Sequence, residues 1–274
     1  MRYMPSVDQV GRMSTHELRA SFLIEDLFGL GEVTLHAIDL DRVIVGSAVP
    51  DEDTLVLGTP EAIAAEYFAE RRELGILNVG GNGRIRVDES SYELGPRDAL
   101  YVGRGNRSIS FESDDVTQPA RFYIVSYPAH AVFPTKRIAA AEANPTELGT
   151  PENANQRVLS KYFHPAAMPT AQLVMGVTRM QTGSVWNTMP PHTHQRRTEV
   201  YLYFDLPEDA IVFHMMGQPN ETRSLVVRNG QVALSPSWSI HAGCGTSSYS
   251  FCWAMGGENQ EFSDMQGVDM RAIQ

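Results

Sequence analysis

The chain has 274 residues, of which 42% are apolar and 20% charged, so one large or two ordinary domains with packed cores are expected and global disorder is excluded. The formal net charge of −11 argues against nucleic acid or an anionic membrane as the main partner, although a pocket can still bind a small anion. The N-terminus has no apolar run of signal-peptide length, and no run of about 18 apolar residues occurs elsewhere. We therefore expect a cytoplasmic protein that does not cross a membrane.

The first 75 residues predict two helices with strands between them. In "STHELRASFLIEDLF", Ser14 and Glu17 form a capping-box pattern at the start of a helix. The segment "GEVTLHAIDLDRVIVGSAVP" alternates and is rich in Val and Ile, which is typical of strands. In "TPEAIAAEYFAERRELG", Thr59 as N-cap, Pro60 at the first helical position and Gly75 as the stop predict a second helix.

From residue 76 onward, short β-type runs are separated by turns rich in Gly, Pro, Asn and Asp, which predicts antiparallel sandwiches or barrels. Residues 134–157 contain three prolines and few large apolar residues, so they predict a connecting arm that is partly helical at "AAAEA". Strands resume up to about residue 256, and a polar tail follows. The expected division is an N-terminal domain without metal ligands (1–133), the arm (134–157) and a metal-binding domain (158–274).

The two β regions resemble each other. "LGPRDALYVGRGNRSISF" and "VRNGQVALSPSWSIHAGCG" both place a turn before an alternating strand and a second turn after it. When Asp98 is aligned with Gln231, Ser108 falls where His241 lies. We therefore predict a duplicated, mainly β fold with few short helices, in which only the second copy carries metal-type residues.

The isolated cysteines and most histidines predict structural roles. Cys244 and Cys252 are too few for a disulfide framework and have no zinc-ribbon spacing, so we expect buried core thiols. The remaining histidines show no ligand-like spacing and are also expected to be structural; they are His16, His36, His130, His164 and His214.

The segment "PPHTHQRRTEVYLYF" carries a candidate metal site. In a strand, His192 and His194 would point to one face, roughly 6.5–7 Å apart, and Pro190 and Pro191 disfavour a helix here. Glu199 lies an odd number of positions after His194, so "QRRT" must contain a bulge or turn if Glu199 is to reach the same ion. A pair of surface histidines beside a solvated charge is the alternative.

A fourth candidate ligand and a cavity wall complete the pattern. His241 follows an alternating strand and a turn at Pro236. In "EVYLYFD", Glu199, Tyr201 and Tyr203 share one face, which indicates a strand that is buried on both sides and lines a cavity. Three imidazoles and one carboxylate suit Zn, Fe, Mn, Ni or Cu, and the ligand set alone does not choose among them.

This pattern resembles the two motifs of the cupin superfamily. Gly183, the two histidines of the pair and Glu199 match the first motif, and Gly230, Pro236 and His241 match the second. Trp238 and Gly245 stand where the second motif has glycine and asparagine, and the gap from Gly183 to the pair is longer than usual. The resemblance implies two cupin-type barrels, that is double-stranded β-helices or jelly rolls, in one chain.

A closer resemblance covers nearly the whole chain. "MRYMPSVDQVGRMSTHELRASFLIEDLF", "NVGGNG", "PPHTHQRRTEVYLYFDL" and "RNGQVALSPSWSIHAG" are similar to the 5-keto-4-deoxyuronate isomerase family, the 4-deoxy-L-threo-5-hexosulose-uronate ketol-isomerases. This implies a homohexamer with one Zn2+ per subunit, bound by His192, His194, Glu199 and His241. The implied reaction converts 5-dehydro-4-deoxy-D-glucuronate to 3-deoxy-D-glycero-2,5-hexodiulosonate in the breakdown of pectin and unsaturated uronates.

An aldose–ketose isomerisation of a sugar acid requires a proton carrier and a cation for the carboxylate. We expect Glu199 or Tyr201 to carry the proton. The candidate cations are Arg179, Arg196, Arg197 and Lys161, with a bulge at "QRRT" placing Arg196 or Arg197 at the mouth of the site. A cupin dioxygenase and a non-catalytic sugar-binding or storage cupin are the alternatives, and the N-terminal domain is expected to serve subunit packing.

Overall fold

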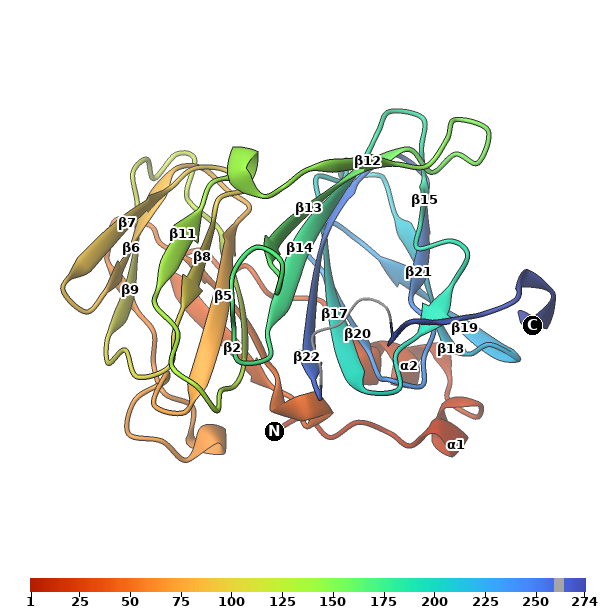
Figure 1. The fold of residues 1–274 in the computed structure, drawn as a ribbon, viewed down its shortest axis with the longest axis horizontal. Coiled ribbons are helices and arrows are strands. Elements are labelled where there is room, and N and C mark those ends of the chain that lie inside the picture. Colours follow the sequence, from red (N-terminus) through yellow and green to blue (C-terminus); the bar gives the residue numbers. More distant parts are fainter. Residues whose placement is uncertain (259–263) are drawn as a thin grey trace. The chain divides into compact units, whose positions relative to one another are not determined.

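The structure is a computed structural model that describes residues 1–258 and 264–274 (Figure 1). It is mainly β. Its short helical elements are α1 (Val7–Val10), α2 (Thr15–Phe22), η1 (Leu40–Arg42), η2 (Glu61–Ile63), η3 (Ala140–Glu142) and η5 (Met270–Ala272). None of the helices in these ranges is long and apolar enough to span a bilayer.

Backbone contacts divide the chain into two compact units. The first unit comprises Met1–Arg2, Leu27–Asn144 and Lys161–Met175. The second comprises Tyr3–Asp26, Pro145–Ser160 and Gly176–Gln274, in which residues 259–263 of the polar tail lie outside the described residues. The sequence-based division at 1–133, 134–157 and 158–274 stays a prediction.

The first unit contains a six-stranded and a four-stranded sheet. The strands of the larger sheet are, in spatial order, β11 (Lys136–Ile138), β8 (Ala99–Val102), β5 (Arg72–Asn78), β10 (Phe122–Pro128), β3 (Ile44–Val49) and β2 (Glu32–Ala37). Those of the smaller sheet are β4 (Leu55–Val56), β9 (Ile109–Ser113), β6 (Gly83–Val87) and β7 (Ser90–Leu94). A continuous apolar core includes side chains from both sheets, among them Leu74, Ile85 and Phe111.

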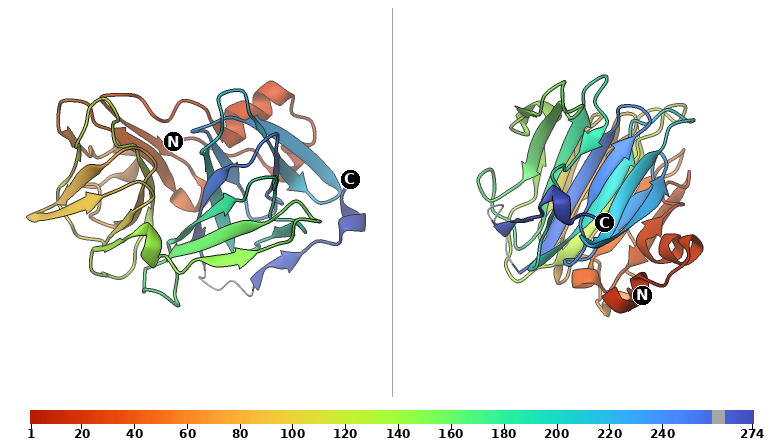
Figure 2. Two further views of the ribbon diagram at one scale, coloured as in Figure 1. Left: turned by 90° about the horizontal axis from the view of Figure 1, so that it is seen from above. Right: turned by 90° about the vertical axis from the view of Figure 1, so that its right-hand side faces the viewer.

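The second unit is built around a seven-stranded sheet, whose strands are, in spatial order, β1 (Leu23–Ile24), β20 (Val232–Ser235), β17 (Arg197–Phe204), β22 (Ser250–Gly257), β14 (Val174–Met180), β13 (Arg157–Phe163) and β12 (Thr146–Leu148). A four-stranded sheet follows the order β15 (Trp186–Asn187), β21 (Ala242–Gly245), β18 (Val212–Gln218) and β19 (Glu221–Val227). A two-stranded ribbon pairs β16 (His192–Thr193) with β23 (Gln266–Gly267). In Figure 2, the teal and blue strands of this unit run side by side.

The strand orders are those of open sheets. Within residues 1–258 and 264–274, each sheet ends in two edge strands, and no sheet closes into a barrel. The mainly β class with few short helices is confirmed, whereas closed barrels are not observed. Each unit instead presents one larger and one smaller sheet of antiparallel pairs.

The two units repeat one strand order, which supports the predicted duplication. In spatial order, the strands β11, β8, β5, β10 and β3 of the six-stranded sheet correspond to β1, β20, β17, β22 and β14 of the seven-stranded sheet. The strands of the two four-stranded sheets also correspond in spatial order. Leu74 of β5 pairs with Val102 of β8, and Glu199 of β17 pairs with Ser235 of β20. By this register, Leu74 and Glu199 occupy equivalent positions in the two units. Ser108 immediately precedes β9, as His241 immediately precedes β21.

The helix predicted at "STHELRASFLIEDLF" is confirmed, but the one predicted over Thr59–Gly75 is wrong. Ser14 and Glu17 form the capping box of α2. In the second segment only η2 is helical, and β5 begins at Arg72. All residues of β5 are buried between β8 and β10, so burial in the sheet overrides the helix-forming tendency of "AERREL". A Cβ on Gly75 would lie 2.8 Å from Leu173 Cδ2, so this glycine serves close packing and not helix termination.

The predicted structural thiols and histidines differ in burial. Cys252 is fully buried and Cys244 half-buried, and both are free thiols. His214 is fully buried, whereas His16 and His130 are exposed.

A buried carboxylate at the start of β5 organises the segment that precedes β14. Glu73 is fully buried, and its carboxylate accepts hydrogen bonds from the backbone N–H groups of Ala171, Gln172 and Leu173 at 2.7–2.8 Å. The Tyr101 hydroxyl donates a fourth bond at 2.6 Å. Three N–H groups that would otherwise be buried without partners are thereby satisfied.

We expect Glu73→Gln to destabilise the protein by roughly 2–4 kcal/mol, because an amide brings its own N–H donors against backbone N–H groups. The midpoint of urea-induced unfolding measures this. Glu89→Gln, at an exposed position in the same unit, is the control and should leave the midpoint unchanged. Equal midpoints for Glu73→Gln and the unmodified protein would contradict this role.

Candidate metal centre

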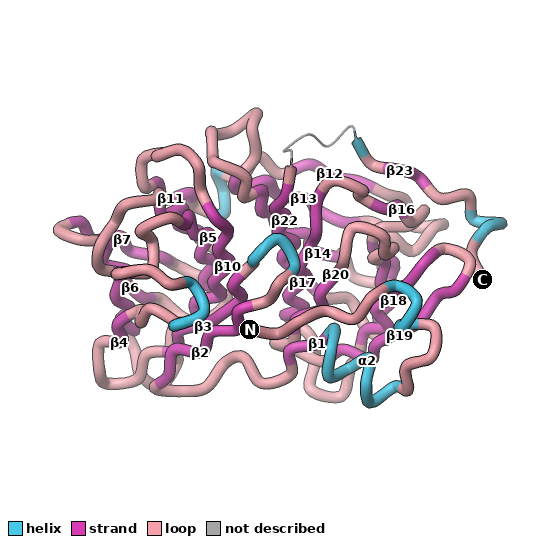
Figure 3. Tube along the Cα trace, turned by 90° about the horizontal axis from the view of Figure 1, so that it is seen from below, coloured by secondary structure: helices cyan, strands magenta, loops and turns pink. Residues whose placement is uncertain are grey.

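The histidine pair lies in extended backbone, as its spacing predicted. His192 and Thr193 form β16 and pair with Gly267 and Gln266 of β23 (Figure 3). A turn at residues 195–196 separates this strand from β17. The turn corrects the odd spacing, so Glu199 reaches the same side as the two histidines. The bend predicted at "QRRT" is therefore present.

His241 comes from a different part of the unit. It follows the turn in which the backbone N–H of Ser239 donates to the Pro236 carbonyl at 3.0 Å, and it directly precedes β21. Its Nδ1 lies 3.4 Å from the Ser239 carbonyl oxygen and 3.4 Å from Ser235 Oγ. These neighbours orient the ring so that Nε2 points toward the histidine pair.

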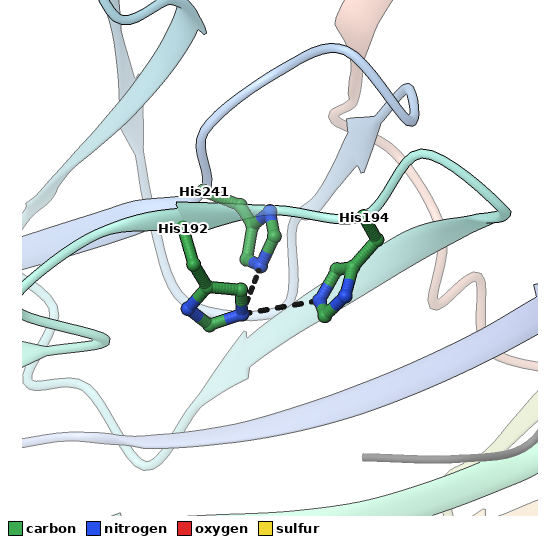
Figure 4. Close-up of side chains that lie close together, drawn as sticks. All are labelled: His192, His194 and His241. Carbon is green, nitrogen blue, oxygen red and sulfur yellow. Dashed lines mark hydrogen bonds between the residues drawn. The ribbon is translucent and has the colours of Figure 1, made fainter. Parts of the chain in front are cut away.

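The ring nitrogens of the three histidines converge on one point (Figure 4). His192 Nε2 lies 3.1 Å from His194 Nε2 and 3.1 Å from His241 Nε2. Glu199 Oε2 lies 3.1 Å from His241 Nε2 and 3.3 Å from His194 Nε2. Three imidazole nitrogens close enough to hold one metal ion are thus present, with a carboxylate oxygen beside them.

The donor atoms fit a divalent cation. Each neutral imidazole has one ring proton, and a proton on His241 Nδ1 leaves its Nε2 as an acceptor that faces other acceptors. Such atoms repel one another at 3.1 Å unless a cation lies between them. Two nitrogens bound to one zinc ion at about 2.0–2.1 Å in tetrahedral geometry lie about 3.3 Å apart, close to the separations found here.

The surroundings keep these groups in the protonation states that bind metals. Burial lowers the pKa of His241 to about 3 and that of His192 to about 4, so both rings are neutral at pH 7. Burial alone would raise the pKa of Glu199, but the adjacent imidazoles outweigh it and lower the pKa to about 2. At neutral pH, Glu199 is thus a carboxylate anion beside the uncharged rings of His192 and His241.

A cavity of about 370 Å³ opens beside the cluster. Its wall is formed by alternate residues of four neighbouring strands, by a loop and by one residue of the C-terminal segment: Arg157, Leu159, Thr178, Thr188, Met189, Pro190, His192, His194, Glu199, Tyr201, Phe251, Trp253, Met255 and Met265. The Trp253 Nε1–H donates to Thr178 Oγ1 at 3.2 Å, and Gly176 leaves the space that the Trp253 ring needs. The volume and the mixture of aromatic and polar groups suit one small polar ligand.

Tyr201 lines this cavity and contacts the cluster. Its hydroxyl forms hydrogen bonds with Glu199 and Thr188, and its ring centroid lies 5.6 Å from that of His241. Burial and the nearby Glu199 carboxylate raise the pKa of Tyr201 well above its usual value, so the phenol stays protonated at neutral pH. A neutral hydroxyl at this position can donate a proton or a hydrogen bond to a ligand.

The four cations predicted to bind a substrate lie elsewhere. Among the described residues none of Arg179, Arg196, Arg197 and Lys161 lines the cavity. Arg179 is exposed, and Arg196 pairs on the surface with Glu258 at 2.9 Å. Arg197 is buried and pairs with Asp264 Oδ1 at 2.9 Å, next to β23. Lys161 lies on β13, the strand of Arg157, but outside the lining of the cavity.

Arg157 is the cation that lines the cavity, and sequence reasoning did not select it. It begins β13, is half-buried, and donates from Nη1 to the Asn155 carbonyl at 2.8 Å. The expected connecting arm ended at this residue, which placed it outside the metal-binding domain. The alternation of "QRVLSKYF" was the available indication, because it puts Arg157 and Leu159 on one face of a strand.

Comparison with known proteins gives consistent family matches. The KduI/IolB family profile matches residues 34–270. A 4-deoxy-L-threo-5-hexosulose-uronate ketol-isomerase from Lachnoclostridium phytofermentans is 50% identical over 273 residues, covering 100% of this chain and 99% of its own. The protein of that name from Formosa agariphila is 52% identical over 264 residues, covering 96% and 94%.

A solved structure agrees at the level of the fold. An IolB-like protein from Salmonella typhimurium LT2 superposes with a TM-score of 0.73 at 13% identity, over 90% of this chain and 97% of that one. At this identity the similarity concerns the fold alone. The profile match and the near-full-length relatives show that the chain belongs to the KduI/IolB family.

Proposed function

We propose that the chain is a metal-dependent ketol-isomerase that converts 5-dehydro-4-deoxy-D-glucuronate to 3-deoxy-D-glycero-2,5-hexodiulosonate. The observation that carries this proposal is the convergence of three imidazoles and one carboxylate beside a cavity whose wall also contains Arg157. The names of the relatives supply the reaction class, ketol isomerisation of a deoxyhexosulose uronate, and the family resemblance implies its place in uronate breakdown. The substrate is a small sugar acid, so it needs both a polar centre for its carbonyl end and a cation for its carboxylate.

We propose His192, His194, Glu199 and His241 as the ligands of one Zn2+ per subunit. The ligand types suit zinc, and buried neutral imidazoles together with a carboxylate would carry a net positive charge once a divalent ion binds. When bound, the metal would act as a Lewis acid that polarises the substrate's carbonyl and hydroxyl oxygens. Arg197 and Asp264 support the ligands from outside by fixing the chain on either side of the β16–β23 ribbon.

The proton must move between C2 and C1 while the carbonyl moves from C1 to C2. Glu199 is the carboxylate at the cavity wall, and Tyr201 is hydrogen-bonded to it. We propose that Glu199 takes the proton from C2 and returns it to C1, while the Tyr201 phenol donates a proton to the C1 oxygen and takes one back from the C2 hydroxyl. Trp253 and Phe251 cover the cavity floor with apolar surface and keep bulk water away from the reacting atoms.

Arg157 is proposed to bind the substrate carboxylate. It is the only lysine or arginine in the cavity wall formed by the described residues, and its guanidinium is partly shielded from water. Burial lowers the pKa of Arg157, but a guanidinium remains charged at neutral pH. A planar fork of donors matches a carboxylate better than a single ammonium does.

The proposed assembly and domain architecture follow the resemblance. We propose that both units derive from the cupin barrel, that the ligand-free N-terminal domain serves subunit packing, and that the protein is a homohexamer. Metal analysis by mass spectrometry would test zinc, and light scattering would test the hexamer.

Purified protein should convert the keto-uronate released by an unsaturated-oligouronide hydrolase into the hexodiulosonate, followed by NMR. Chelation should abolish turnover, and re-addition of Zn2+ should restore it, because the donor set would be left without its ion. Turnover should be equal in air and in strictly anaerobic buffer. Oxygen-dependent turnover would instead favour a dioxygenase, and absence of turnover in the metal-loaded protein would favour a sugar-binding role.

Glu199→Gln should lower kcat by at least about 100-fold while metal content falls far less, since glutamine keeps an oxygen donor but cannot accept the proton. Turnover and metal per subunit are measured on the same preparation. Glu258→Gln, on the surface nearby, is the control and should change neither. Parallel losses of metal and activity would leave Glu199 as a ligand only.

Arg157→Ala should lower kcat/KM about 10- to 150-fold, because a hydrogen-bonded charge pair with the carboxylate is lost. Arg157→Lys should retain part of the activity. Arg179→Ala, on the neighbouring strand but exposed, is the matched control. The defect should shrink for an analogue whose carboxylate is replaced by a hydroxymethyl group, and an equal defect for both compounds would argue against this assignment.

A further inference from the structure

The first unit contains a second cavity, of about 210 Å³, whose wall has an unusual charge. Its polar side chains are Arg42, Arg71 and Arg72, and counted over the part of the chain that the structure describes, its wall has no aspartate or glutamate. The remaining wall is mostly aliphatic and includes Ile38, Val43, Ile44 and Ile63. Three guanidinium groups around one hollow are notable in a chain with a net charge of −11.

Arg72 is the innermost of the three. It is only 6% exposed, and its hydrogen bonds go to uncharged oxygens. Its Nε donates to Ser126 Oγ at 3.1 Å, and its Nη2 donates to the carbonyls of Arg42 at 2.6 Å and Ser126 at 2.8 Å. Burial and the positive charge of Arg42 lower the pKa of Arg72 to about 10. The positive charge of Arg72 is therefore buried close to the positive charge of Arg42.

In the second unit, the buried arginine at the equivalent position has a carboxylate partner. Arg72 is two residues before Leu74, and Arg197 is two residues before Glu199, the residue equivalent to Leu74 in strand register. Arg197 is also buried, at 2% exposure, but it pairs with the Asp264 carboxylate at 2.9 Å. Both units thus have a buried arginine at this position of the repeated strand arrangement. A protein carboxylate accompanies it in the second unit, and an open cavity accompanies it in the first.

We infer that this cavity binds a compact oxyanion, the carboxylate or phosphate group of a small molecule, in the place that a carboxylate takes beside Arg197. Arg72 forms the back of the site, and Arg42 and Arg71, which are exposed, form its mouth. Arg71 also lies 3.0 Å from Glu70, but the Arg71 side chain is 65% exposed, so this pair would be weak. The aliphatic wall would enclose the body of the ligand and strengthen the charge contacts by excluding water.

Isothermal titration calorimetry of the full-length protein with inorganic phosphate and, separately, with acetate at fixed ionic strength tests this site. We expect saturable binding of at least one anion, with one site per chain, and the preferred probe identifies the chemical group. The double variant Arg42→Ala/Arg71→Ala should weaken binding about tenfold or more, since two charged donors are lost. It changes only exposed side chains, so the fold should be retained.

Arg86→Ala removes an exposed arginine of the same unit outside this cavity and should change affinity less than twofold. Both variants should keep the turnover of the unmodified protein, which separates this site from the proposed active site. Absence of saturable binding of either anion, or equal affinity in the double variant, would overturn the inference.

Discussion

The arrangement of the second unit depends on one electrostatic constraint, the convergence of four acceptor-bearing side chains in a largely buried place. Glu199, His194 and His241 are each at most 5% exposed, and Glu199 Oε2 lies 3.1–3.3 Å from Nε2 of the two histidines. A carboxylate surrounded by neutral ring nitrogens is costly in a medium that solvates charge poorly. A cation at their centre removes that cost, so the proposed metal would stabilise the fold as well as supply the chemistry.

The first unit has the same strand order, but its described residues lack the four converging polar side chains. Leu74 takes the place of Glu199, and by strand register Ile76 and Ile124 take those of Tyr201 and Trp253. All three belong to one continuous apolar core. Where the second unit keeps a cavity and polar groups, the first packs hydrocarbon, which stabilises the fold but leaves no room for a ligand at that position. At equivalent positions, the first unit therefore has a packed apolar core and the second has a cavity lined by metal-type side chains.

Sequence reasoning succeeded where the relevant contacts are local. The pair at His192 and His194, the turn before Glu199 and the capping box of α2 each depend on spacings of a few residues. It failed where long-range packing decides. The segment before Gly75 has helix-forming residues but is enclosed between two strands, and Arg157 reaches the cavity only because β13 lies two strands from β22. No local sequence pattern indicates that this segment is enclosed by strands or that Arg157 lies at the cavity.

Arg197, the buried arginine that begins β17, connects the C-terminal segment with the proposed site. Being charged and inaccessible to water, Arg197 requires a partner, and Asp264 supplies it from the C-terminal segment. The same segment contributes β23, which pairs with the strand of His192, and Met265, which lines the cavity. One ion pair thus attaches the C-terminal segment to β17, the strand that carries Glu199. In the proposed site, Arg197 would therefore hold the wall, and Arg157, which lines the cavity, would bind the substrate carboxylate.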